Sequence, residues 1–151
     1  MFNIVLYQPE IPPNTGNIIR LCANTGCSLH LIEPLGFKLE NKQLRRAGLD
    51  YHEWAEVKTY RSIDELKPEQ KVYALSTKGQ KLYHQVNFQA GDYLVFGPET
   101  RGLPEEYLNQ LKLNHILRLP MLEHSRSLNL SNTVAIVTYE ALRQNQFMDL
   151  Y

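Results

Sequence analysis

Short runs of apolar, β-branched and aromatic residues alternate along the chain with segments whose apolar residues recur every three to four positions. Runs of the first kind are typical of buried strands, and the second spacing is typical of helices that cover a sheet. Their order predicts an α/β fold, a mostly parallel sheet flanked by helices. Strands are expected at residues 2–7, 28–33, 71–76, 92–97 and 115–120.

Helices are expected between and after these strands, at residues 15–26, 41–49, 62–67, 104–112 and 131–145. No internal repeat, low-complexity tract or long linker interrupts this order, so we expect a single domain over residues 1–151. Ligands of such folds bind at the loops beyond the carboxyl ends of the strands. Functional side chains are therefore expected in these loops.

Charge and composition narrow the function classes. The 16 Lys and Arg residues balance the 16 Asp and Glu residues, so any nucleic-acid surface must be local. No apolar run approaches the roughly 20 residues of a membrane span, and the N-terminus lacks the pattern of a secretory signal, so a cytoplasmic protein is expected. Cys22 and Cys27 lack metal-site spacing and the histidines are scattered, which predicts two buried thiols and no metal site.

The loop after the first expected strand reads "PEIPPNTGNIIR". Its two prolines are expected to end the strand, and Asn14 or Thr15 to cap the next helix. One face of this helix is apolar, whereas Asn17, Arg20 and Asn24 form a polar stripe on another. The stripe is either an ordinary solvated face or part of an anion site at which Arg20 binds phosphate.

Two later loops also carry candidate chemistry. In "FGPETRGLP", a plain strand-to-helix turn accounts for Gly97, Gly102 and the proline, but not for Glu99. The spacing matches neither the dinucleotide-binding nor the P-loop motif. In "LPMLEHSRSLNLSN", capping the last helix needs only one Ser or Asn. The remaining polar side chains, with Arg126, indicate a binding loop, although Ser/Asn clusters also occur in ordinary surface loops.

The segments "NTGNIIR", "LVFGPETRGLP" and "LPMLEHSRSLNLSN" resemble the three ordered motifs of the SPOUT superfamily of knotted methyltransferases. The resemblance is strongest to the tRNA ribose 2′-O-methyltransferases that act on the wobble cytidine or uridine. It implies a SPOUT fold with a C-terminal trefoil knot, S-adenosylmethionine bound in that knot, and a homodimer. It also implies tRNA as the partner, with leucine isoacceptors expected.

Matching the motifs position by position implies two sets of site residues. The cofactor contacts would be Leu75, Thr77, Gly97, Leu119, Met121 and Ser127. The residues around the reacting ribose would be Asn14, Arg20, Glu99, Ser127 and Asn129. In this reaction a ribose hydroxyl attacks a sulfonium methyl group without a metal. A guanidinium cannot ordinarily accept a proton, so Arg20 is expected to position the hydroxyl, with a base role left open.

A shared active site is expected in the homodimer, with Arg20 of one chain near the cofactor of the other. The candidate interface combines the first helix with apolar positions of the last, which could equally be intramolecular core: Leu130, Val134, Val137, Ala141 and Leu142. A basic cluster, Lys42, Arg45 and Arg46, is either a solvated face or a tRNA contact. The alternative function is a non-catalytic RNA-binding SPOUT module.

Overall fold

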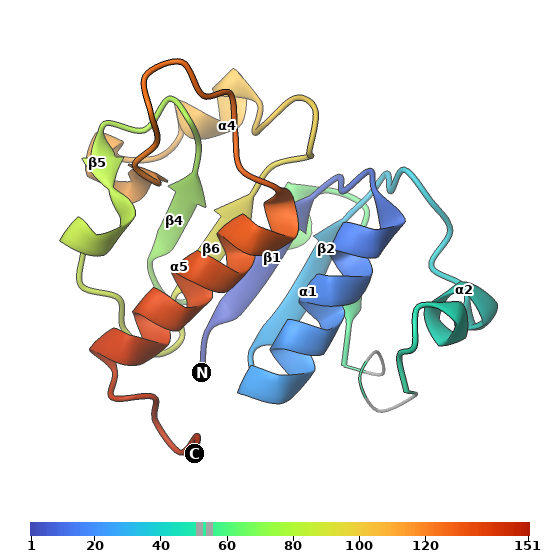
Figure 1. The fold of residues 1–151 in the computed structure, drawn as a ribbon. Coiled ribbons are helices and arrows are strands. Elements are labelled where there is room, and N and C mark those ends of the chain that lie inside the picture. The colour runs from blue at the N-terminus through green and yellow to red at the C-terminus, as the bar shows by residue number, and fades with distance from the viewer. Residues whose placement is uncertain (51–52, 54–55) are drawn as a thin grey trace.

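The computed structural model describes residues 1–50, 53 and 56–151. Within them, seven strands form one sheet in the order β3-β2-β1-β6-β4-β7-β5 (Figure 1). Every pair of neighbours is parallel, which confirms the expected α/β class. The strands are β1 (Asn3–Tyr7), β2 (Ser28–Ile32), β3 (Lys58–Tyr60), β4 (Val72–Leu75), β5 (Lys81–Leu82), β6 (Tyr93–Phe96) and β7 (Ile116–Arg118).

Two long helices, α1 (Pro12–Thr25) and α5 (Leu130–Gln144), lie side by side over one face of the sheet (Figure 1). The shorter helices are α2 (Asn41–Arg46) and α4 (Glu105–Leu108), and single 3₁₀ turns form η1 (Ile63–Glu65), η2 (Tyr83–Gln85) and η3 (Leu113–His115). Helices on both faces leave the central strands buried, which explains their nearly continuous apolar sequences. In β1, Ile4 and Leu6 pack toward α1 and α5, whereas Val5 packs toward α4.

The structure departs from the sequence expectations at several elements. Strands β3 and β5 were not expected, and η1 and α4 are shorter than the helices predicted at 62–67 and 104–112. The predicted cap of α1 was wrong, because the helix begins at Pro12 after Ile11, without a side-chain cap. Proline suits the first helical turn, whose N–H groups have no intrahelical partner. Asn14 and Thr15 are buried inside the helix instead.

The apolar positions proposed as a dimer interface on α5 belong to the intramolecular core, so that assignment was wrong. Each is at most 9% exposed, because α5 turns this face toward the sheet: Leu130, Val134, Val137, Ala141 and Leu142. The outer face of α5 instead exposes Ile136 and Tyr139, at 39% and 47%.

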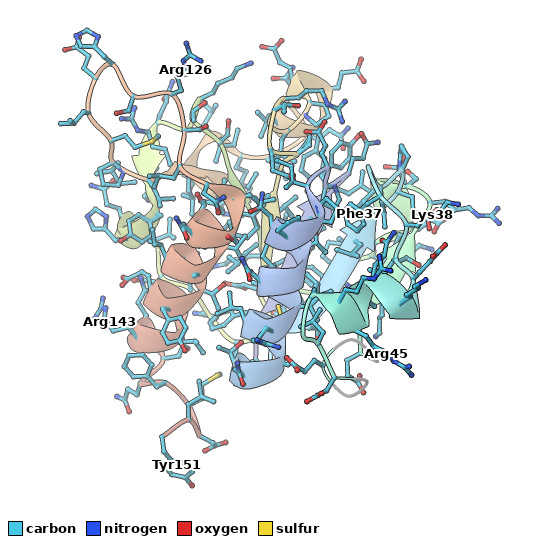
Figure 2. All side chains as sticks on the ribbon, turned by 45° about the vertical axis from the view of Figure 1, so that its right-hand side comes forward. Phe37, Lys38, Arg45, Arg126, Arg143 and Tyr151 are labelled. Carbon is cyan, nitrogen blue, oxygen red and sulfur yellow. The ribbon has the colours of Figure 1, made fainter. Side chains whose placement is uncertain are left out.

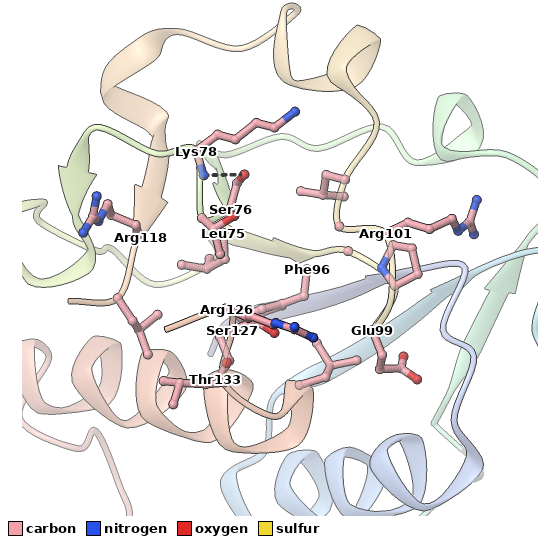
Figure 3. Close-up of a pocket in the computed structure, with 18 of the residues that line it drawn as sticks. Leu75, Ser76, Lys78, Phe96, Glu99, Arg101, Arg118, Arg126, Ser127 and Thr133 are labelled. Atoms are coloured by element: carbon pink, nitrogen blue, oxygen red, sulfur yellow. Dashed lines mark hydrogen bonds between the residues drawn. The ribbon is translucent and has the colours of Figure 1, made fainter. Parts of the chain in front are cut away.

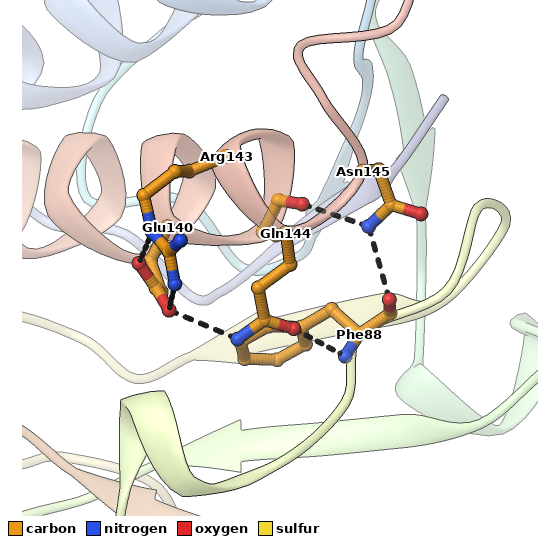
Figure 4. Close-up of polar contacts among 6 residues, drawn as sticks. Phe88, Glu140, Arg143, Gln144 and Asn145 are labelled. Atoms are coloured by element: carbon orange, nitrogen blue, oxygen red, sulfur yellow. Dashed lines mark hydrogen bonds and ion pairs between the residues drawn. The ribbon is translucent and has the colours of Figure 1, made fainter.

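The carboxyl end of α5 is fixed to the loop before β6 (Figure 4). Gln144 Oε1 accepts the backbone N–H of Phe88 at 2.9 Å, and Asn145 Nδ2 donates to the Phe88 carbonyl at 3.0 Å. Glu140 holds both Arg143 and Gln144 from one turn earlier. Both backbone groups of a buried residue are thereby satisfied, and the helix is held along the sheet.

Both cysteines are buried, as expected, and burial raises the pKa of the Cys22 and Cys27 thiols. Among the described helices, none has the length and apolar character that crossing a bilayer requires.

His30 joins three strands from inside the sheet. Its Nδ1 lies 2.9 Å from the Tyr60 hydroxyl and its Nε2 lies 3.0 Å from Asn3 Oδ1. The Asn3 oxygen can only accept, so Nε2 carries the proton and Nδ1 accepts from the tyrosine. Burial, with a smaller effect of Lys58, lowers the pKa of His30 to about 4. The folded protein therefore holds His30 neutral.

We expect this neutral histidine to make the fold acid-sensitive. The unfolded chain takes up a proton near the ordinary histidine pKa of about 6.5, whereas folded His30 resists protonation until about 4. The free energy of unfolding should therefore fall as the pH drops through this window. His30→Gln should show a smaller fall between about pH 7.5 and about pH 5 in urea unfolding. Exposed His124→Gln is the matched control, and equal pH dependence in all three proteins would contradict this account.

Candidate functional site

A cavity of about 420 Å³ lies beyond the carboxyl ends of β4, β6 and β7 (Figure 3). Three loops build its walls, at residues 76–78, 97–103 and 119–128, and the first turn of α5 closes one side. Parallel strands bring their carboxyl ends to one edge of a sheet, which is why segments so distant in sequence meet here.

All six residues expected to contact the cofactor line this cavity: Leu75, Thr77, Gly97, Leu119, Met121 and Ser127. Leu75 and Leu119 are buried apolar walls, while Thr77 and Ser127 are exposed polar groups at the rim. Apolar walls with a few convergent polar groups are typical of small-molecule sites.

Gly97 is required by a close backbone contact. A Cβ at this position would lie 2.4 Å from the Leu103 nitrogen and 2.5 Å from the Gly102 carbonyl carbon. Neither backbone atom can move aside as a flexible side chain could. The loop after β6 therefore folds back on itself only if residue 97 has no side chain.

Glu99 lines the cavity, but its carboxylate is already bound by backbone N–H groups. It accepts from Glu10 at 3.1 and 3.2 Å and also from Ile11. In return, Glu10 accepts the Thr100 N–H at 3.0 Å and its hydroxyl at 2.7 Å, and these bonds lower the pKa of Glu10. The two carboxylates thus join the loop after β1 to the loop after β6. The role of Glu10 was missed, because its sequence context shows only an acid after a strand.

Asn14 and Asn129 are brought together from opposite ends of the chain. Asn129 Nδ2 donates to Asn14 Oδ1 at 3.0 Å, and Asn129 Oδ1 caps α5 by accepting from the Asn132 N–H at 3.2 Å. Leu128 and Leu130, on either side of Asn129, both line the cavity. This pair therefore fixes the first turn of α5 against α1 at the cavity edge.

Arg20 does not line the cavity of its own chain. It lies on α1 with its side chain 50% exposed, and its Nε binds Glu53 Oε2 at 3.1 Å. Its Nη2 donates to the Gly48 carbonyl. Five donors and two such contacts leave part of the guanidinium edge available to a ligand. Of the five residues expected around the ribose, Glu99 and Ser127 therefore line the cavity, Asn14 and Asn129 are bonded to each other beside it, and Arg20 lies apart.

The cavity lining is strongly cationic. It includes Lys78, Arg101, Arg118 and Arg126, against Glu99 as the single acid. The Nε of Arg118 is buried and has no hydrogen-bond partner in the described part of the chain. Within the same part, no group of three or more His, Cys, Asp or Glu side chains has a metal-binding arrangement. The arrangement suits a ligand with anionic groups around an apolar centre.

Known proteins are similar to this chain in sequence and in fold. The model of the SpoU rRNA Methylase family matches residues 1–139. A tRNA (cytidine(34)-2′-O)-methyltransferase of Saccharophagus degradans is 61% identical over 150 residues, 97% of each chain. A solved structure concerning the 2-OH methylation of C/U34 on tRNA is 45% identical, with a TM-score of 0.87 and 97% of each chain covered. A SpoU methyltransferase of Streptomyces viridochromogenes in complex with the cofactor AdoMet has a TM-score of 0.80 at 21% identity, over 95% of this chain and 57% of that one, which shows the fold alone.

Two glycine substitutions should have opposite effects on stability. Gly97→Ala should lower the free energy of unfolding by about 1–3 kcal/mol, because the new methyl group overlaps backbone. Gly16→Ala is the matched control. Gly16 lies inside α1, and a Cβ there would be at an ordinary 3.6 Å from the Cβ of Ala47. It should raise stability by about 0.5–1 kcal/mol. Urea unfolding of both variants at one protein concentration tests this, and a neutral Gly97→Ala would contradict the close contact.

Proposed function

The chain belongs to the SpoU rRNA Methylase family, and we propose that it methylates the ribose 2′-hydroxyl of nucleotide 34 in tRNA, using S-adenosylmethionine. The observation that carries this proposal is the 61% identity, over 97% of both chains, to a tRNA (cytidine(34)-2′-O)-methyltransferase. Cytidine or a modified uridine is the expected nucleotide, and leucine isoacceptors are the tRNAs that the motif resemblance implies. The chain acts as one domain in the cytoplasm.

The cavity suits S-adenosylmethionine in its size and in its apolar walls, while its cationic side chains suit the RNA phosphates. Its volume of about 420 Å³ lies within the usual range of small-molecule sites. Leu75 and Leu119 would enclose the adenine, and backbone groups of the same loops would bind its edge. The backbone contact at Gly97 supports the wall beside them. When bound, the cofactor supplies an electrophilic methyl group.

The side chains around the cavity align the acceptor and manage its charge. Arg20 would hold the ribose oxygen and stabilise the negative charge that develops on it. Ser127, in the loop at residues 119–128, would lie near the reacting groups. The Asn14–Asn129 hydrogen bond holds the junction between that loop and α5. Glu99 would shape the site through its backbone contacts rather than exchange a proton. The hydroxyl proton leaves to water or to an RNA phosphate.

A homodimer would complete the site. Arg20 does not line the cavity of its own chain, and in a dimer it would act on a ribose at the cavity of the partner. The outer face of α5, with Ile136 and Tyr139 exposed, supplies apolar surface for such contact. A two-fold axis would use this surface twice and build two shared sites.

A trefoil knot accounts for the unusual strand order. β7 lies between β4 and β5, although β4 and β5 are consecutive in the chain. The connection at residues 76–80 must therefore cross β7, and Ser76 donates its N–H to the Leu117 carbonyl at 2.9 Å. If the polypeptide passes through this crossing on its way to α5, the chain is knotted. Knotted folds are rare.

Methyl transfer tests the function directly. Incubation with isotopically labelled S-adenosylmethionine and tRNA from a strain lacking the activity should place the label on the ribose of nucleotide 34, as nucleoside mapping will show. Arg20→Ala should abolish transfer yet largely spare cofactor affinity in calorimetric titration, because Arg20 belongs to the polar stripe proposed to face the RNA and not to the three loops that build the cavity. If wild-type protein binds tRNA but transfers no label, the non-catalytic alternative is correct. If Arg20→Ala loses cofactor affinity, its assigned role is wrong.

Subunit mixing tests the shared site. Neither Arg20→Ala nor Ser127→Trp protein should transfer methyl groups alone. After verified subunit exchange, each heterodimer regains one pocket with both residues intact. About half of the dimers are mixed and half of their pockets work, so about a quarter of the wild-type rate should return. If heterodimers form and bind cofactor without recovering activity, the sites are not shared.

A further inference from the structure

A second cavity, of about 270 Å³, lies between the first turns of α1 and the segment that leads into α2. Its apolar walls come from Pro12, Pro13, Phe37, Leu39 and Leu44. We call it the α1–α2 slot. None of the residues expected to contact the cofactor or the ribose lines it.

Lys38 lines the α1–α2 slot, and the segment around it is basic. Residues 38–46 contain Lys38, Lys42, Arg45 and Arg46 against the single acid Glu40, and all five side chains are exposed. Figure 2 shows Phe37, Lys38 and Arg45 on the side of the molecule that carries α2, away from Arg143 and Tyr151. An aromatic wall beside a cationic rim is the combination that binds unpaired nucleotides, through base stacking and phosphate contacts.

The slot is continuous with the surface that presents Arg20. Gly16 lines the slot and faces Ala47, and one helical turn later Arg20 binds the carbonyl of the next residue, Gly48. Four residues of α-helix separate the two positions by about 6 Å. A base in the slot would therefore belong to the nucleotide whose ribose meets Arg20, or to one beside it.

We propose that the α1–α2 slot binds one unpaired nucleobase of the tRNA anticodon loop, with Phe37 stacked on the base and Lys38 on a flanking phosphate. The proposal rests on the proposed function, which brings nucleotide 34 to Arg20.

Binding without turnover tests the slot. The probe is an anticodon stem-loop of the substrate tRNA, titrated by fluorescence anisotropy. Loss of one base–aromatic stack predicts that Phe37→Ala binds roughly 5- to 150-fold more weakly. Lys38→Gln should reduce the dependence of log affinity on log salt by about one phosphate contact. Exposed Phe147→Ala and Lys67→Gln are the matched controls and should bind like wild type.

A fluorescent base locates the contact. With 2-aminopurine at each loop position in turn, one position should be quenched by wild-type protein and recover in Phe37→Leu, which keeps the apolar wall but not the ring. Cofactor affinity of Phe37→Leu, measured by calorimetry, should stay unchanged. The slot proposal is overturned if both Phe37 variants bind the stem-loop as wild type does, or if Phe37→Leu quenches like wild type at every position. Wild-type protein that binds the stem-loop yet methylates no tRNA would instead refute the proposed function.

Discussion

The cavity beyond β4, β6 and β7, the proposed cofactor site, depends on one crossing of the chain, where residues 76–80 pass against Leu117. A Cβ at Gly79 would lie 2.7 Å from the Leu117 carbonyl carbon, so the two backbones meet with no room for a side chain. This contact and the Ser76 hydrogen bond hold β7 between β4 and β5. The loops after β4 and β7 are consequently neighbours, and they form opposite parts of the cavity wall. Strand order thus creates the site, and the side chains then determine what it binds.

A second constraint ties α1 to the cavity. Glu10 and Glu99 each accept backbone N–H groups from the other's loop, across about 90 positions of sequence. These donors hold both carboxylates in a fixed geometry, and the bonds from Thr100 lower the pKa of Glu10. Because α1 begins directly after Glu10 and Ile11, these hydrogen bonds set the direction of the helix that carries Arg20. Loss of activity on replacing Glu99 would therefore report lost geometry.

Sequence patterns predicted the parts of this protein that depend on local signals. The buried strands have apolar runs, and the motif residues Leu75, Gly97 and Leu119 do meet at one cavity. Strands β3 and β5 could not be predicted, because they are only three and two residues long and too short to show an apolar pattern. They become strands by pairing with β2 and β7, respectively. The partners of Glu10 and of Arg20 also depend on packing between segments far apart in sequence. Periodicity cannot place such pairs.

The chain has a net charge of zero, yet two groups of its cations lie where the proposed substrate would bind. Lys78, Arg101, Arg118 and Arg126 surround the cavity, whose one acid, Glu99, is occupied by N–H donors. A second basic group, in residues 38–46, includes Lys38 of the α1–α2 slot. In the proposed dimer, Arg20 and the slot of one subunit approach the cavity of the other, so the two basic groups join into one surface. Anionic RNA would then be attracted locally without a global field, and its binding should weaken steeply with salt.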